Sequence, residues 1–151
     1  MPPPRHDDPR IARIVEFFER LTREDVARLG AIYAADVRFK DPFNELRGLA
    51  GVQRVYAEMF VALEAPRFVV HDIAVAGEHC FLTWDFLFRQ RRLGDRVVRG
   101  CSHLQLDADG RIACTCSLPA WPWPTMAFFI CSAVYSTTSR SCPTSAAIAA
   151  P

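Results

Sequence analysis

Three stretches of the first 63 residues repeat their apolar positions at the three- and four-residue spacing of an amphipathic helix. The first stretch follows Asp8-Pro9, a pair that suits the cap and the first turn of a helix. The second opens at Thr22, with Asp25 three residues later as in a capping box. The third runs from about residue 49 to residue 63. The apolar stripes are Ile11, Ile14, Val15, Phe18 and Leu21; then Val26, Leu29, Ile32 and Tyr33; then Val52, Val55, Tyr56, Met59, Phe60 and Leu63.

Beyond Pro66 the apolar residues follow the pattern of β-strands, rich in Val, Phe and Leu and separated by turn residues such as Gly77 and Gly94. The predicted strands are 37–39, 68–76, 79–90, 96–106 and one that begins at Arg111. Three helices followed by such a meander are typical of an α+β fold. The sequence therefore predicts a curved antiparallel sheet wrapped around three N-terminal helices.

The pattern is lost from about Ala113. Of the 18 basic and 17 acidic residues, only Arg140 lies beyond that point, and neither a helical nor a strand period continues. Three interpretations remain open: an out-of-frame translation of a GC-rich gene, a disordered native tail, or a hydrophobic interaction segment. We predict a disordered N-terminus over residues 1–8, one domain over 9–117, and an anomalous tail, unpacked or out of frame, over 118–151.

Composition narrows the classes of partner. The net charge of +1 gives no basic surface for nucleic acid and no polybasic patch for a membrane. No apolar run approaches the length of a membrane span, and no signal-peptide pattern is present, so we predict a cytoplasmic protein. Cys114 and Cys116 lack a second ligand pair at zinc-site spacing. We therefore expect neither a metal nor a cofactor.

Several motifs resemble those of a known superfamily. The stretch from Phe17 to Pro42 contains Tyr33-Ala-Ala-Asp-Val and then Asp41-Pro42, and the glycine-led segment 48–56 and the turn 107–112 follow at fitting distances. This order resembles the nuclear transport factor 2-like superfamily, in particular its SnoaL-like and ketosteroid isomerase-like members. The resemblance implies a cone-shaped fold with an apolar interior pocket and a homodimer formed through the sheet. Relatives often place His and Asp-Tyr-Trp after Asp-Gly-Arg-Ile, where this chain departs from residue 113 onward.

The resemblance makes Asp41 the candidate catalytic residue. In ketosteroid isomerases the Asp of this Asp-Pro pair is the general base that moves a proton beside a carbonyl. A carboxylate placed among Phe39, Phe43 and Met59 would be partly desolvated, which suits a base. The alternative is an Asp that only forms the turn before Pro42.

The same resemblance implies the residues that line the ligand site. Tyr33 and Tyr56 match tyrosines that support the oxyanion donor, but the donor position itself falls at Phe17, which has no hydroxyl, and the second donor falls at Ser102. Trp84, Phe86 and Phe88 alternate along the predicted strand 79–90 and so share one aromatic face. The predicted ligand-binding residues are Phe17, Tyr33, Phe43, Tyr56, Met59, Trp84, Phe86 and Ser102. The alternative for the tyrosines and for the aromatic face is that they are core residues.

These observations predict a SnoaL-like pocket protein that binds a small apolar molecule, with Asp41 as the base of a proton transfer or a hydrolysis. Two alternatives stay open. One is a non-catalytic, dimeric binding or scaffold domain of the nuclear transport factor 2 type. The other is an inactive product of a frame-shifted gene.

Overall fold

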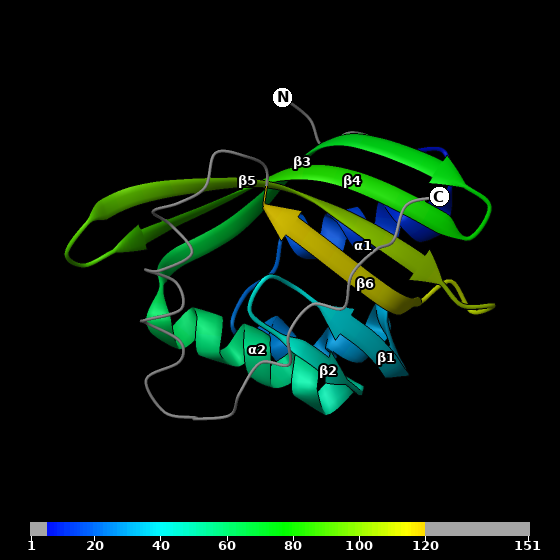
Figure 1. Ribbon diagram of the computed structural model, residues 1–151, viewed down its shortest axis with the longest axis horizontal. Coiled ribbons are helices and arrows are strands. Elements are labelled where there is room, and N and C mark those ends of the chain that lie inside the picture. Colours follow the sequence, from blue (N-terminus) through cyan, green and yellow to red (C-terminus); the bar gives the residue numbers. More distant parts are fainter. Residues whose placement is uncertain (1–5, 120–151) are drawn as a thin grey trace, which may run out of the picture.

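The computed structural model describes residues 6–119 (Figure 1). Two α-helices, α1 (Pro9–Glu19) and α2 (Leu49–Ala62), and a 3₁₀ helix, η1 (Glu24–Ala31), accompany one six-stranded sheet of order β2-β1-β6-β5-β4-β3. The strands are β1 (Tyr33–Lys40), β2 (Glu45–Arg47), β3 (Glu64–Ala76), β4 (His79–Gln90), β5 (Gly94–Leu106) and β6 (Ile112–Pro119). The α+β fold predicted from the sequence is confirmed.

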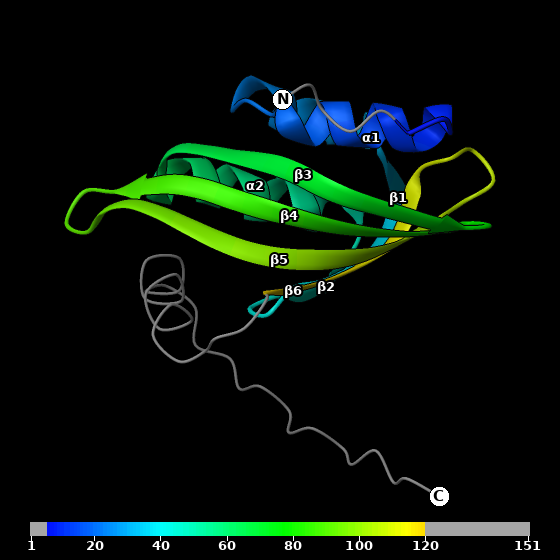
Figure 2. The same cartoon turned by 90° about the horizontal axis from the view of Figure 1, so that it is seen from above.

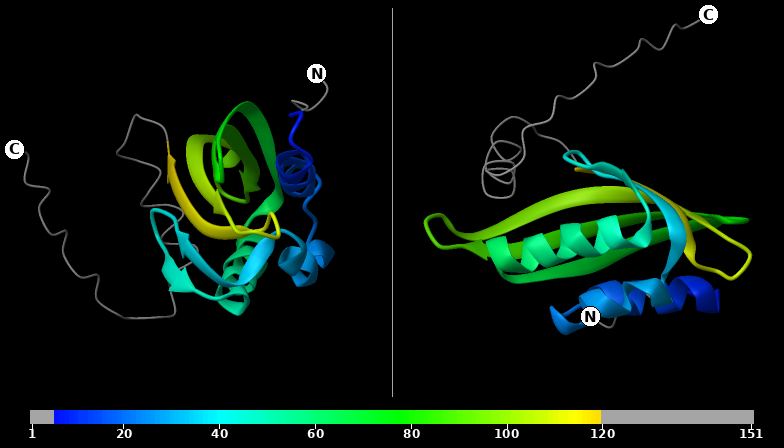
Figure 3. Two further views of the ribbon diagram at one scale, coloured as in Figure 1. Left: turned by 90° about the vertical axis from the view of Figure 1, so that its right-hand side faces the viewer. Right: turned by 90° about the horizontal axis from the view of Figure 1, so that it is seen from below.

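The sheet is strongly curled, and the helices close its open side (Figure 3, left). Helix α1 packs on β3, whereas α2 packs on β1, β2 and β3. Seen from above, the long strands β3, β4 and β5 run side by side, and α1 lies next to β3 (Figure 2). The inner face of the sheet and the apolar faces of the helices form one core, which contains Ile11, Ile14, Val15, Val37, Val52, Val70, Cys80, Leu82, Leu104 and Ile112.

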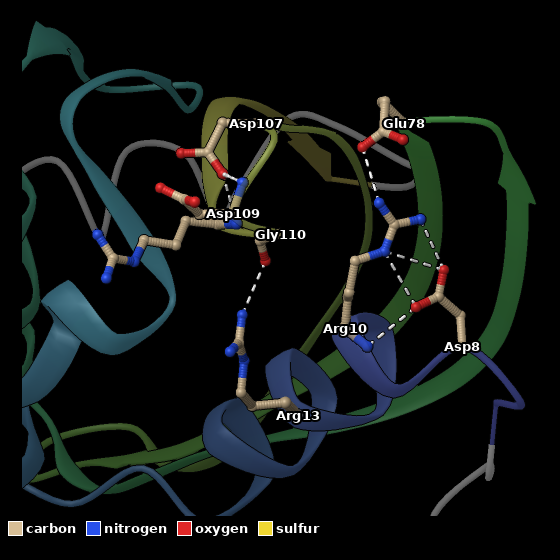
Figure 4. Close-up of polar contacts among 8 residues, drawn as sticks. Asp8, Arg10, Arg13, Glu78, Asp107, Asp109 and Gly110 are labelled. Carbon is tan, nitrogen blue, oxygen red and sulfur yellow. Dashed lines mark hydrogen bonds and ion pairs between the residues drawn. The ribbon is translucent and has the colours of Figure 1, made fainter.

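The start of α1 follows the sequence signal closely. The Asp8 carboxylate caps the helix by accepting a hydrogen bond from the Arg10 backbone N–H (2.9 Å), and Pro9 occupies the first turn. The Arg10 guanidinium binds Asp8 and also Glu78, in the turn between β3 and β4 (Figure 4). Arg13 donates to the Gly110 carbonyl, in the turn between β5 and β6. Two arginines of α1 therefore fasten the helix to two turns of the sheet.

The second helix is shorter than predicted. Asp25 does accept from the Thr22 N–H and hydroxyl, as a capping box requires, but the helix is of the 3₁₀ type and ends at Ala31. Tyr33 was predicted on this helix and instead begins β1. The reason is tertiary: the Ile112 N–H donates to the Ile32 carbonyl (2.7 Å), so pairing with β6 takes over the backbone there.

Two features of the sheet differ from the expected antiparallel meander. Strands β1 and β6 pair in parallel, with Phe39 opposite Thr115, while the other pairs are antiparallel. The short strand β2, which pairs with the end of β1, was not predicted.

The predicted domain boundary at residue 117 falls inside β6. Leu118 and Pro119 pair with Cys101 and Gly100 of β5 and so belong to the sheet. The remainder of the predicted tail, and residues 1–5 of the predicted N-terminal segment, lie outside the described residues.

Candidate functional site

Asp41 lies in the tight turn between β1 and β2, where its carboxylate organises the backbone. Its Oδ1 accepts from the N–H of Phe43 (2.7 Å), the N–H of Asn44 (2.5 Å) and the Asn44 side-chain amide (3.1 Å). Its Oδ2 accepts a second bond from that amide (2.9 Å). The carboxylate is half-buried, and its hydrogen bonds within the described chain all go to this turn. Of its two oxygens, Oδ2 has the greater capacity for a further partner.

Tyr33 and Tyr56 meet at the centre of the core. They come from β1 and α2, both are buried, and their hydroxyl oxygens lie 3.4 Å apart, which is long for a hydrogen bond between hydroxyls. Burial raises the pKa of Tyr33 to about 12 and raises the pKa of Tyr56 well above 10, and the negative charge of Asp41 adds to both shifts. Both hydroxyls therefore stay protonated at neutral pH and can donate. Asp41 is near enough for its charge to act on both.

Thr115 adds a third hydroxyl to this centre. It lies on β6 opposite Phe39, and only 3% of the residue is exposed. Its hydroxyl lies near that of Tyr33 and offsets a small part of the pKa rise there, yet Oγ1 has no well-formed hydrogen bond to any described residue. Sequence reasoning missed this residue, because a single Thr in an unpatterned stretch carries no signal.

Aromatic rings surround the three hydroxyls. Phe18 contacts the rings of Tyr33 and Tyr56 (centroids 6.2 Å apart in each case), and Phe39 also contacts both rings (6.5 Å in each case). The predicted lining residue Phe17 is half-buried and packs at the edge of the core, so the helix presents its neighbour Phe18 to the tyrosines. The hydroxyls thus lie in an apolar, aromatic surrounding.

A second aromatic group forms on the inner face of β3 and β4. Phe68 stacks on Phe86 (4.6 Å, 22°) and meets Trp84 edge-on (6.0 Å, 84°). The Trp84 indole N–H donates to the Ser102 hydroxyl (2.9 Å), which shares a further hydrogen bond with Ser117 (2.7 Å). The predicted residues Trp84, Phe86 and Ser102 are therefore brought together.

The predicted residues thus fall into two groups with Met59 between them. Tyr33 and Tyr56 form one group, and Trp84, Phe86 and Ser102 form the other. Met59 of α2 packs against the main core and also against the Phe86 cluster, which consists of Leu63, Phe86 and Phe88. Phe43 stays in the Asp41 turn and is half-buried. The inner wall is therefore aromatic with a few neutral hydroxyls, and the charge of Asp41 acts on the two tyrosines in it.

The outer face of the same strands is different in character. Asp85 lies between His71 (3.1 Å) and Arg99 (3.6 Å). Further along, the rings of Phe81 and His103 stack (4.5 Å, 7°). Three large apolar side chains are open to solvent on the strands: Phe81 (49% exposed), Val97 (46%) and Leu118 (56%).

Within residues 6–119, no three His, Cys, Asp or Glu side chains are grouped so that they could hold a metal ion. Likewise, none of the helices in this part of the chain has the length and apolar character needed to cross a membrane.

Solved structures with the same architecture come from several bacteria. An NTF2-like protein from Exiguobacterium sp. 255-15 is 15% identical and superposes with a TM-score of 0.64, covering 75% of this chain and 99% of that one. A protein with a ketosteroid isomerase-like fold from Catenulispora acidiphila DSM 44928, solved in complex with trimethylamine, is 13% identical (TM-score 0.63, 76% and 85% covered). An LEH-like epoxide hydrolase from M. tuberculosis is 20% identical (TM-score 0.61, 74% and 83% covered). At these identities the likeness establishes the fold.

The sequence itself carries the family assignment. No curated protein sequence matches the chain. The profile of the SnoaL-like domain, in contrast, matches residues 14–115, a range that runs from the core of α1 to the middle of β6 and takes in Asp41 and both buried tyrosines. Because the match spans well over half of the sequence, the chain belongs to the SnoaL-like domain family.

Proposed function

We propose that this protein binds a small, mainly apolar molecule inside the cone and holds one oxygen of that molecule at the hydroxyls of Tyr33, Tyr56 and Thr115. The observation that carries the proposal is the Thr115 hydroxyl, which lies near that of Tyr33 and has no well-formed hydrogen bond to any described residue, while the two tyrosine hydroxyls share one long contact. A buried hydroxyl left without a partner costs about 1–3 kcal/mol. A ligand carbonyl or hydroxyl would supply the missing partner, and the surrounding rings of Phe18 and Phe39 suit an apolar remainder.

The charges support a neutral ligand. The tyrosines are protonated at neutral pH, so they offer donors without charge, and Asp41 places a negative charge nearby. An anionic ligand would be repelled by that carboxylate. A ketone or an alcohol would be accepted.

We further propose that Asp41 acts as a general base toward a ketone bound in this way. Its Oδ2 would take a proton from the carbon beside the carbonyl, and the C–H electron pair would move into an enolate whose oxygen is stabilised by the tyrosine hydroxyls. Return of the proton to another carbon completes an isomerisation. Toward an epoxide or an ester in the same place, the carboxylate would instead take a proton from a water molecule whose oxygen bonds to the electrophilic carbon. The C–O bond of the ligand would break, and its leaving oxygen would take up a proton, which gives a hydrolysis.

A competing proposal is binding without catalysis. Its support is the Asp41 turn itself, since the carboxylate already has a complete structural role in accepting from Phe43 and Asn44.

On the outer face, a second copy of the chain is the partner we propose for the exposed Phe81, Val97 and Leu118. Asp85 is already paired with His71 and Arg99, so a dimer there would not bury an unpaired carboxylate.

The test uses 2-tetralone, a neutral bicyclic ketone, as the probe. Thr115→Val keeps the shape of the side chain and removes the hydroxyl, so the affinity should fall roughly five- to ten-fold while thermal stability is kept or rises. Equal affinity in the two proteins would exclude the proposed oxygen site.

For catalysis, the exchange of the α-protons of 2-tetralone for deuterium is followed by NMR. Asp41→Asn should slow that exchange at least about 100-fold with little change in affinity, whereas the purely structural role predicts no catalysed exchange in either protein.

A further inference from the structure

Gly100 of β5 lies directly opposite Trp84 in the β4–β5 register. A Cβ atom built on Gly100 would lie 2.3 Å from Cη2 and 2.5 Å from Cζ2 of Trp84, and 2.8 Å from the Leu118 carbonyl oxygen. The backbone of Gly100 is not in the left-handed region, where the turn glycines such as Gly94 lie. Glycine is therefore required here for space, because the indole ring lies against the strand where any side chain would stand.

A second contact fixes the edge of the same ring. Ser102, two residues along β5 and so on the same face, accepts a hydrogen bond from the Trp84 indole N–H at 2.9 Å. Phe68 meets the ring edge-on, and Phe68 is itself held by its stack on Phe86. The ring is thus fixed at its six-membered end by Gly100, at its N–H by Ser102 and at a third side by Phe68, without any ligand.

The half-buried ring faces the interior that the proposed function assigns to the ligand. Trp84 packs against both the main core and the Phe86 cluster, so it lies where the two meet. Its only polar group is already satisfied by Ser102. What the ring still offers is its π-surface, which favours an offset or edge-on contact with another flat ring.

We propose that Gly100 and Ser102 position the Trp84 ring as a rigid flat wall, so that the site selects planar, conjugated ligands over saturated ligands of the same skeleton. This inference rests on the proposed ligand site and names its ligand class. A ring held in place before binding loses little freedom when the ligand arrives, which makes the selectivity a property of the three residues together.

Two probes with one skeleton test the proposal: 2-naphthalenemethanol, whose ring system is planar, and decahydro-2-naphthalenemethanol, its saturated counterpart. Each carries one primary alcohol, so the oxygen site meets the same group in both. We expect the protein to bind 2-naphthalenemethanol roughly three- to ten-fold more tightly after correction for the different water–octanol partition of the two probes. Gly100→Ala and Trp84→Leu should each bring the corrected ratio toward one. Ser102→Ala should lower the ratio less and should move the Trp84 indole N–H signal in a ¹⁵N NMR spectrum.

Controls separate this inference from the proposed function. Cys101→Ala changes the exposed residue between the two positioning residues and should leave the ratio unchanged. Thr115→Val should weaken both probes equally. If Gly100→Ala does not fold, as judged by circular dichroism, Trp84→Leu carries the test. Equal corrected affinities in the unsubstituted protein, or a ratio that survives Trp84→Leu, would overturn the planar selectivity alone. If neither probe binds the unsubstituted protein, the proposed binding function fails and this inference fails with it.

Discussion

The two faces of the β4–β5 ribbon differ in chemistry although their residues alternate along the same strands. Inward, Leu82, Trp84 and Ser102 are apolar or neutral, and the polar atoms of Trp84 and Ser102 bind each other. Outward, Asp85 binds His71 and Arg99, and Phe81 stacks on His103 in solvent. The inner face excludes charge and keeps a few hydroxyls, which suits a neutral ligand. The outer face mixes paired charges with exposed apolar rings, which suits a protein partner.

The largest expected effect comes from placing a charge on the inner face. Leu82→Asp puts a carboxylate at a site that is 4% exposed, with apolar neighbours, and should lower the free energy of unfolding by more than about 4 kcal/mol. Its matched control is Phe81→Asp, one residue along the strand on the outer face. That change should leave the stability of the monomer within about 1 kcal/mol and should weaken self-association, measured by analytical ultracentrifugation. Similar losses of stability in both variants would show that the two faces do not differ as described.

A somewhat smaller effect is expected from alkaline pH, and it sharpens the description of the interior. The folded-state pKa of Tyr33 is about 12, above the ordinary value of 10, so the folded protein keeps a proton that the unfolded chain releases. The stability is therefore fully present below pH 10 and falls as the pH rises from 10 to 12, by on the order of 3 kcal/mol for this one group. Tyr33→Phe should remove that part of the loss in urea titrations at pH 9 and pH 11. A pH dependence identical to that of the unsubstituted protein would contradict the buried, neutral state of Tyr33.

How much of this could be read from the sequence depends on the range of the interactions involved. The Asp8 cap and the bounds of β4 follow from local signals and were predicted correctly. The start of β1 at Tyr33 was not, because it depends on pairing with β6, whose first residue is almost 80 positions away. In the site, the helical stripe of the sequence already contained Phe18, which contacts both tyrosines, whereas the family resemblance pointed to Phe17. The roles of Thr115 and Gly100 depend on cross-strand neighbours, which no local pattern reveals.

The smallest expected effect concerns stability at acid pH and comes from Asp8, at the start of α1. The hydrogen bonds from Arg10 hold the pKa of Asp8 at about 2, below its usual 3.8 (Figure 4). A lowered folded-state pKa means that this contribution is present above pH 3.8 and is lost as the pH falls toward 2. Asp8→Asn should therefore flatten the acid limb of the stability profile only slightly, because the side chain is only half-buried and solvent screens its interaction with Arg10. A steep acid limb that persists unchanged in this variant would assign the acid sensitivity to other carboxylates.

The central claim is that the buried hydroxyls of Tyr33, Tyr56 and Thr115 hold the oxygen of a neutral ligand. The direct measurement is the ¹³C NMR shift of 2-tetralone labelled at its carbonyl carbon, because hydrogen bonds to a carbonyl move this signal downfield. We predict a downfield shift of the bound carbonyl that becomes smaller in Thr115→Val and smaller again in Tyr33→Phe. A bound carbonyl signal at the same position in all three proteins would contradict the claim.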